Sequence, residues 1–190
     1  MALRGRVELP EGLTYRDEFV TPAEELGLIE LAAGLDMHHV VIRDQPSRRL
    51  VRHFGYGYDY ESSRVREGEP IPYELEPLRR RAEEFAGLDD GSFVEALVTF
   101  YPVGAGINWH RDAPAFGDRI VGVSLGAPSR MQLRAGEGQD RRVYEQVLEP
   151  RSAYLLSGPA RRVWQHHIPP TRGDRYSVTF RTLRRARAAA

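Results

Sequence analysis

The sequence lacks cysteine and lysine: none of its 190 residues is a cysteine, and all 27 basic residues are arginines. Without cysteine there can be no disulfide, thiolate nucleophile or cysteine-bound zinc ion. Without lysine there can be no Schiff base, P-loop lysine or lysine general base. A metal ion bound by this chain must therefore be held by histidine and carboxylate side chains.

Long apolar segments are also missing. No run approaches the roughly 18 apolar residues that span a bilayer, and residues 1–6 lack the apolar stretch of a secretory signal. We therefore expect a cytoplasmic protein with no membrane partner. The length, with 41% hydrophobic and 28% charged residues, is typical of one globular domain covering residues 1–190.

Charge is balanced overall but not along the chain. The net charge is zero, yet from Arg141 onward 11 arginines accompany only three acidic residues. A basic segment of this kind is typical of a face that binds nucleic acid or another anion, although an ordinary solvated surface produces it more often.

Two helices are expected before the middle of the chain. In the first, over residues 21–34, Thr21 and Glu24 can form a capping box and Pro22 suits the first turn. In the second, over about 74–86, apolar residues recur at helical spacing and a glycine follows. We expect both helices to pack outside a sheet.

The chain after residue 95 is rich in short strands. Segments with β-branched and aromatic residues, separated by glycine and proline, cover 96–102, 119–125, 130–135, 141–148, 152–157, 162–168 and 175–183. Seven consecutive strands favour two antiparallel sheets closed as a jelly roll. We therefore expect an α+β, mainly β fold, namely a double-stranded β-helix with supporting N-terminal helices.

One segment offers two metal ligands side by side. After Tyr101 a glycine-rich turn leads to His110 and Asp112, which share one face of an extended chain. A third ligand from a distant strand would complete a facial triad with open positions, and either His166 or His167 can supply it, because successive strand residues face opposite sides and only one of the two should point inward. The alternative is a buried structural histidine bonded to a carbonyl group.

The last predicted strand alternates between polar and apolar residues. Arg175, Ser177, Thr179 and Arg181 lie on one face, and tyrosine, valine and phenylalanine on the other. If the polar face lines the jelly roll, its guanidinium and hydroxyl groups can bind a small dicarboxylate through bidentate hydrogen bonds. The alternative is an amphipathic strand with both arginines in water.

Together, His110-x-Asp112, the segment from Trp164 to Pro169 and the strand over 175–181 resemble the AlkB family of iron(II) and 2-oxoglutarate dioxygenases. The resemblance covers about residues 50–183. It implies that His110, Asp112 and His166 bind iron. It also implies the following 2-oxoglutarate contacts: Arg175 with the distal carboxylate, assisted by the hydroxyl of Tyr101, and Arg181 near the metal-chelating end. The hydroxyls of Ser177 and Thr179 are expected to contact 2-oxoglutarate from the alternation of the strand, and Ser177 stands where the family frequently has an asparagine.

The same resemblance implies an activity. With iron(II), 2-oxoglutarate and oxygen, such an enzyme hydroxylates a carbon atom, or demethylates an N-methyl group, and releases succinate and carbon dioxide. The expected substrate is a base in alkylated DNA or RNA, or in modified tRNA, so nucleic acid is the expected partner and no obligate protein partner is evident. Residues 1–95 would provide helical support and a substrate lid, and residues 96–183 the catalytic jelly roll.

An aromatic segment lies ahead of the predicted core. It contains His53, Phe54, Tyr56 and Tyr58, which could form a mobile lid that stacks on a base, or a β-hairpin whose aromatic rings pack the core. It resembles most closely the tRNA wobble-uridine hydroxylase branch of the AlkB family. Residues 113–114 are Ala-Pro where the DNA-repair members carry acidic residues, which counts against direct-reversal DNA repair.

Two other functions stay open from the sequence. An oxygenase of this kind could hydroxylate a protein or a small molecule. The jelly roll could also be a binding module without catalytic activity.

Overall fold

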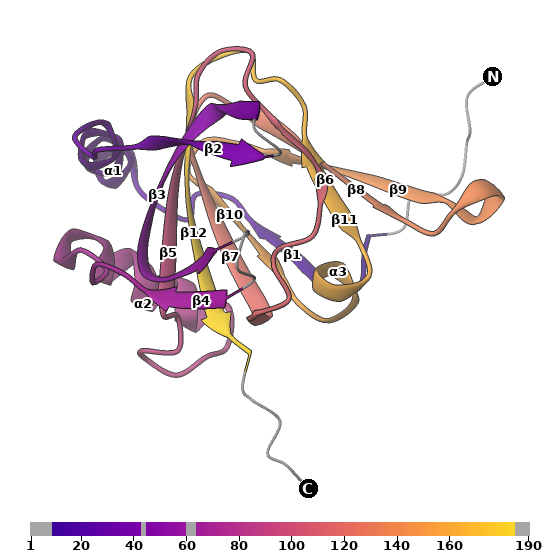
Figure 1. The fold of residues 1–190 in the computed structure, drawn as a ribbon, viewed down its shortest axis with the longest axis horizontal. Coiled ribbons are helices and arrows are strands. Elements are labelled where there is room, and N and C mark those ends of the chain that lie inside the picture. The colour runs from indigo at the N-terminus through magenta and orange to yellow at the C-terminus, as the bar shows by residue number, and fades with distance from the viewer. Residues whose placement is uncertain (1–8, 43–44, 60–63, 185–190) are drawn as a thin grey trace, which may run out of the picture.

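The computed structural model describes residues 9–42, 45–59 and 64–184, with the backbone alone at Ile42, Tyr58, Asp59, Arg64 and Val65 (Figure 1). Its helices are α1 (Pro22–Ala33), α2 (Glu76–Phe85) and the short α3 (Gly158–Arg162), with 3-10 turns at Tyr73–Leu75 and Gly138–Asp140. The two expected helices are confirmed. The predicted capping box is present at α1, where the Glu24 amide donates to Thr21 Oγ1 and the Thr21 amide donates to Glu24 Oε2.

The strands in the described residues form two antiparallel sheets, which together make a jelly roll. Their bounds are β1 Leu13–Arg16, β2 His38–Ile42, β3 Gln45–Asp59, β4 Arg64–Glu67, β5 Glu95–Tyr101, β6 Ile107–His110, β7 Phe116–Gly126, β8 Ser129–Ala135, β9 Arg142–Leu148, β10 Ser152–Leu156, β11 Gln165–Ile168 and β12 Arg175–Leu183. The large sheet has the order β1-β10-β7-β12-β5-β3-β2, with β4 paired to β3, and the small sheet has the order β6-β11-β8-β9.

The seven expected strands are present as β5 and β7 to β12. The segment expected over 162–168 is shorter, because α3 extends to Arg162 and β11 begins only at Gln165. Five further strands occur in the described residues, namely β6 and the four before residue 70. The long β3 matters most, because it joins the large sheet beside β5 and so brings residues 50–55 next to the jelly-roll core.

One face of the large sheet is covered by helices. In Figure 1, α1 and α2 lie on one side of this sheet, and the β8–β9 hairpin projects from the opposite side. Outward-facing residues of β5, β7, β10 and β12, such as Val98 and Phe180, pack with Leu78 and Ala82 of α2 in one buried cluster. Phe180 is fully buried and stacks on Phe93 with a centroid distance of 5.9 Å.

The other face of the large sheet meets the small sheet. Apolar residues such as Met131, Leu133 and Leu156 fill one part of this interior. On β12, however, the interior residues are the four polar ones predicted from alternation, with exposed fractions of 1% to 8%. The alternative in which both arginines lie in water is therefore wrong. The interior of the jelly roll is apolar in one part and polar along β12.

Among the described residues, no helix has the length and apolarity needed to cross a membrane.

Replacing Phe180 by alanine should lower the free energy of unfolding by about 3–5 kcal/mol, because the substitution leaves a cavity in the helix-covered core. Urea denaturation of the two proteins measures the difference. Val143→Ala, at a side chain that is 49% exposed on β9, is the control and should change stability by less than about 0.5 kcal/mol. Equal losses in the two variants would contradict this description of the core.

Candidate active site

The first ligand, His110, is oriented by an irregularity in β6. His110 pairs with His166 and Ile107 with Ile168, so β6 has one residue more than β11 over this stretch, which is a β-bulge. The bulge allows both Ile107 and His110 to face the interior. His110 Nδ1 lies 2.8 Å from the carbonyl oxygen of Asn108, a contact that fixes the ring and leaves Nε2 for a metal ion.

The second ligand, Asp112, lies in the loop after β6. Its backbone is held by Arg161 of α3, which is 7% exposed and donates hydrogen bonds to the carbonyl groups of Asp112, Ala113, Phe116 and Gly117. A buried guanidinium that binds several carbonyl groups of one loop fixes the path of that loop. The loop therefore presents Asp112 in a defined position.

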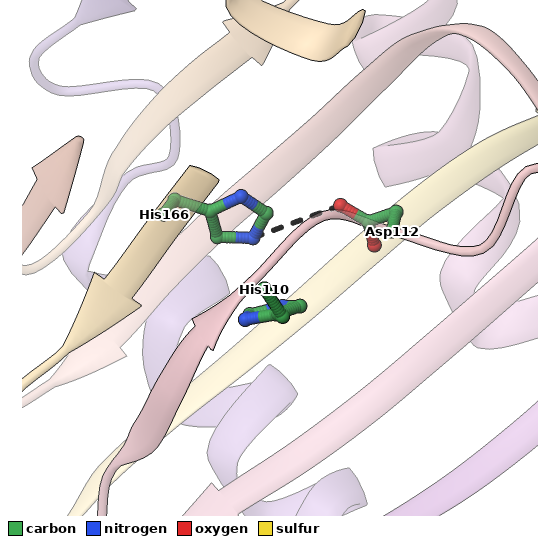
Figure 2. Close-up of side chains that lie close together, drawn as sticks. All are labelled: His110, Asp112 and His166. Carbon is green, nitrogen blue, oxygen red and sulfur yellow. Dashed lines mark ion pairs between the residues drawn. The ribbon is translucent and has the colours of Figure 1, made fainter. Parts of the chain in front are cut away.

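The third ligand, His166, lies on β11 beside His110. One ligand atom from each of His110, Asp112 and His166 can be chosen so that all lie within 4.8 Å of one another. Figure 2 shows the three side chains converging from β6, the following loop and β11. The predicted triad thus comes together in the structure. Two imidazoles and one carboxylate are the ligand set of non-haem iron(II) oxygenases, so these residues fit that metal.

Burial sets the protonation of the triad. It lowers the pKa of His166 to about 3 and also lowers that of His110, where Asp112 opposes the shift. Burial alone would raise the pKa of Asp112, but the Arg181 guanidinium together with His166, His110 and Arg161 outweighs burial and holds that pKa well below its usual value. At neutral pH the triad is therefore two neutral imidazoles and a carboxylate, which are the forms that bind metal.

The contact between His166 Nε2 and Asp112 Oδ2 has a distance of 3.6 Å. Because His166 is neutral, this contact is not a salt bridge, and the distance is too long for a hydrogen bond. It is better described as two ligand atoms that face the same point.

Arg175 is a buried cation with no carboxylate partner in the part of the chain that the structure describes. It is 1% exposed, and its Nη2 donates to Ser124 Oγ at 2.9 Å, while Nε and Nη1 have no hydrogen-bond partner among the described residues. The guanidinium carbon lies 4.9 Å from the ring centroid of Tyr101. Buried donors are rarely left unpaired. These two free donors fit an anionic ligand, and a carboxylate of 2-oxoglutarate is suitable.

Arg181 lies beside the metal site. Its Nε and Nη2 donate to Asp112 Oδ1 at 2.9 and 2.6 Å, and its Nη1 lies 3.0 Å from both carboxylate oxygens of Glu95. The guanidinium is therefore bound between two carboxylates. A contact of Arg181 with the metal-chelating end of 2-oxoglutarate stays a prediction.

Tyr154 of β10 adds a hydroxyl group to the interior. It is 8% exposed, and its ring lies against Gly122, where an added Cβ atom would clash with the Tyr154 ring. Burial raises the pKa of Tyr154 to about 12, so the hydroxyl stays a donor at neutral pH. Gly122 is paired with Thr179 on β12, so this hydroxyl belongs to the same polar interior as Arg175. Ser177 and Thr179 face this interior as predicted.

The four residues of β3 that were expected to bind substrate do not share one environment. His53 lies at the edge of the polar interior, with Nδ1 3.1 Å from Glu95 Oε1. Phe54 is corrected: it is 4% exposed and packs in the helix-covered core, because successive strand residues face opposite sides. Tyr56 is partly buried beyond Gly55, where β3 leaves β5 and pairs with β4. The side chain of Tyr58 lies outside the described residues.

His167 faces away from the metal site, as alternation requires. Its ring stacks on Trp109 with a centroid distance of 5.0 Å, and Nδ1 lies 2.7 Å from the carbonyl oxygen of Ile107. Arg134 covers the Trp109 ring at 4.3 Å. His167 therefore supports β6, the strand that carries His110.

Four residues of the site were not expected from the sequence: Glu95, Ser124, Tyr154 and Arg161. Glu95 shares the alternation of Thr99 and Tyr101 on β5, a signal that could have placed it on the inner face. Ser124, Tyr154 and Arg161 have no comparable sequence signal, because their positions depend on how β7, β10 and α3 pack.

A family model described as "2OG-Fe(II) oxygenase superfamily" matches residues 21–187. Among curated proteins, the "Alkylated DNA repair protein ALKBH8 homolog" of Arabidopsis thaliana is 33% identical and covers 92% of this chain and 55% of its own length. The "tRNA (carboxymethyluridine(34)-5-O)-methyltransferase ALKBH8" of Mus musculus is 32% identical, covering 90% of this chain and 26% of its own length. The chain thus spans about half and about a quarter of these relatives.

Solved structures agree on the fold. OsALKBH1 superposes with a TM-score of 0.71 at 17% identity, covering 93% of this chain and 99% of that one. A prolyl hydroxylase of Trichoplax adhaerens, in complex with a hypoxia inducible factor peptide fragment, gives a TM-score of 0.64 at 14% identity over 90% and 83% of the two chains. At these identities the likeness shows the jelly-roll fold alone.

The metal-free protein should become less stable as the pH falls from about 6.5 towards 3, because the unfolded chain protonates His166 while the folded chain, with a pKa of about 3, does not. Urea denaturation in a chelator between pH 4.5 and 7.5 measures this. His166→Gln should flatten the dependence, whereas His38→Gln, at an exposed position, should keep the wild-type slope. A slope unaffected by His166→Gln would contradict the shift.

The family match covers most of the chain, the fold is that of solved oxygenases, and the metal triad and the unpaired arginine have the chemistry that iron(II) and 2-oxoglutarate require. The chain therefore belongs to the 2OG-Fe(II) oxygenase superfamily, as an AlkB-like dioxygenase that depends on iron(II), 2-oxoglutarate and oxygen.

Proposed function

We propose that this protein oxidises a base in nucleic acid, by hydroxylation or by oxidative demethylation, with a modified uridine of tRNA as the favoured substrate. 2-Oxoglutarate is converted to succinate and carbon dioxide in the same reaction. The observation that carries the oxygenase part is the buried Arg175, whose two unpaired donors lie on the same strand and face as Arg181, the residue bound to the metal ligand Asp112.

The residues of the site have separate roles in the proposed reaction. His110, Asp112 and His166 would hold iron(II), which with 2-oxoglutarate activates oxygen for attack on a C–H bond. Arg175 would bind a carboxylate of 2-oxoglutarate, and Tyr101 packs against its guanidinium. The apolar interior around Leu133 and Leu156 keeps water away from the reacting atoms.

The nucleic-acid part of the proposal is supported by the curated relatives. Of the two relatives described, one is named for repair of alkylated DNA and the other for a modified uridine at position 34 of tRNA. The named methyl transfer is not carried over, because this chain covers about a quarter of that protein. The neutral pair Ala113-Pro114, after the metal ligand, favours RNA over direct-reversal DNA repair.

The test is an assay of the purified protein with iron(II), 2-oxoglutarate and oxygen against tRNA, methylated RNA and methylated DNA, with products read by mass spectrometry. A base that gains one oxygen atom or loses one methyl group, with an equal amount of succinate, is the expected result, and tRNA should give the highest yield. Turnover seen only with peptides or metabolites would contradict the substrate class. The absence of any 2-oxoglutarate conversion that depends on His110 would contradict the activity.

Arg175→Gln should weaken binding of 2-oxoglutarate by about tenfold to a hundredfold, because a hydrogen bond to a charged group contributes about 1.5–3 kcal/mol. Calorimetric titration with N-oxalylglycine, an unreactive analogue, measures the affinity without turnover. Arg134→Gln removes an arginine that covers Trp109 away from the metal site, and it should leave the affinity unchanged. Equal affinities of the wild type and the Arg175 variant would show that Arg175 does not bind the diacid.

A further inference from the structure

Glu95 is a buried carboxylate beside the metal site, but it is not a member of the His110, Asp112 and His166 triad. Its side chain is 0% exposed. It begins β5 and lies directly opposite Arg181 of β12 on one side and Gly55 of β3 on the other. Glutamate is almost never fully buried unless it is paired. The partners of Glu95 therefore indicate what it does.

Its main partner is the arginine that holds the metal ligand. Both carboxylate oxygens of Glu95 lie 3.0 Å from Nη1 of Arg181, and the other side of the same guanidinium holds Oδ1 of Asp112 through Nε and Nη2. The guanidinium is planar, so a contact that fixes one edge also fixes the orientation of the other edge. Glu95 thus determines the direction in which Arg181 meets Asp112.

The orientation matters because Asp112 has two oxygens. Oδ1 accepts both hydrogen bonds from Arg181, while Oδ2 lies 3.6 Å from Nε2 of His166 and faces the triad. A carboxylate held at one oxygen offers the other to a metal ion in a defined direction. If Arg181 turned, Asp112 could rotate about its own side chain and the triad would lose its shape.

Charge acts in the same direction. A lone guanidinium beside the triad would repel a divalent cation and withdraw electron density from the ligating carboxylate. The carboxylate of Glu95 neutralises that guanidinium inside the protein. Nδ1 of His53 on β3 lies 3.1 Å from Glu95 Oε1, and the His53 side chain is 32% exposed. A series of contacts therefore runs from His53 through Glu95 and Arg181 to Asp112.

We propose that Glu95 is a positioning residue of the metal centre: by binding Arg181, it orients Asp112 and maintains the affinity of the triad for a divalent metal ion. This inference rests on the proposed function only in assuming that the triad holds a metal. It assigns Glu95 no contact with the metal, 2-oxoglutarate or substrate.

The test is cobalt(II) binding to the metal-free full-length protein at pH 7, followed by calorimetry and by the visible absorption of the bound ion. Glu95→Gln should weaken cobalt binding by about tenfold, the lower end of the effect of losing a direct partner of a metal ligand, because Glu95 acts on Asp112 through Arg181, and should change the absorption spectrum. Glu95→Asp keeps the negative charge and should recover most of the affinity. Neither readout requires turnover, 2-oxoglutarate or nucleic acid.

Glu83→Gln is the matched control, because Glu83 is 1% exposed but accepts a hydrogen bond from the amide of Phe93 on the helix side of the sheet. It should bind cobalt like the wild type. If Glu95→Gln does not fold, the double variant Glu95→Leu, Arg181→Met removes both charges, a replacement that buried ion pairs often tolerate, and should also bind cobalt weakly.

Three outcomes would overturn the inference. The first is that the folded Glu95→Gln variant, or the double variant, has the same cobalt affinity and the same absorption spectrum as the wild type. The second is an equal loss of affinity in Glu83→Gln. The third is a wild-type protein that binds no cobalt, or binds it independently of His110, which would also remove the proposed function. The first two leave the proposed function intact.

Discussion

The structure depends on a carboxylate buried between two sheets. Asp112 can be kept ionised there only if a cation is close, and Arg181 provides it through two hydrogen bonds to one oxygen. Arg181 is itself buried and has a second carboxylate, Glu95, on its other edge. The metal site is thus part of a network of charges that reaches across β12 and β5, rather than three ligands on an otherwise ordinary surface.

This network explains why a jelly roll has one polar wall. Sandwich interiors are usually apolar because unpaired polar groups inside them are costly. Here the four inner residues from Arg175 to Arg181 on β12 are polar. Each nitrogen of the Arg181 guanidinium has a partner, whereas two nitrogens of Arg175 have none among the described residues. The two arginines therefore differ in their partners: Arg181 is paired with carboxylates of the protein, whereas Arg175 has donors that fit a carboxylate of a ligand.

The strand β3 connects this site to the region where substrate is expected. Alternation divides its aromatic segment, so that His53 reaches Glu95 while Phe54 packs under the helices. Strands β3 and β4 pair, and Phe54 packs in the core, as the hairpin interpretation of this segment predicted. The lid interpretation stays a prediction. Contacts through Glu95 and Arg181 connect His53, at the edge of the polar interior, to Asp112.

The sequence alone determined the ligand types, the jelly roll and the polar face of β12, because these follow from residue chemistry and from the twofold alternation of strands. Tertiary structure decided the rest. The bulge in β6 that turns His110 inward, the loop contacts of Arg161 and the position of Tyr154 over Gly122 depend on packing between segments far apart in the chain. The partners of Arg181 depend on packing for the same reason: its spacing from Arg175 placed it on the correct face, but only the folded chain brought Glu95 and Asp112 to its two edges.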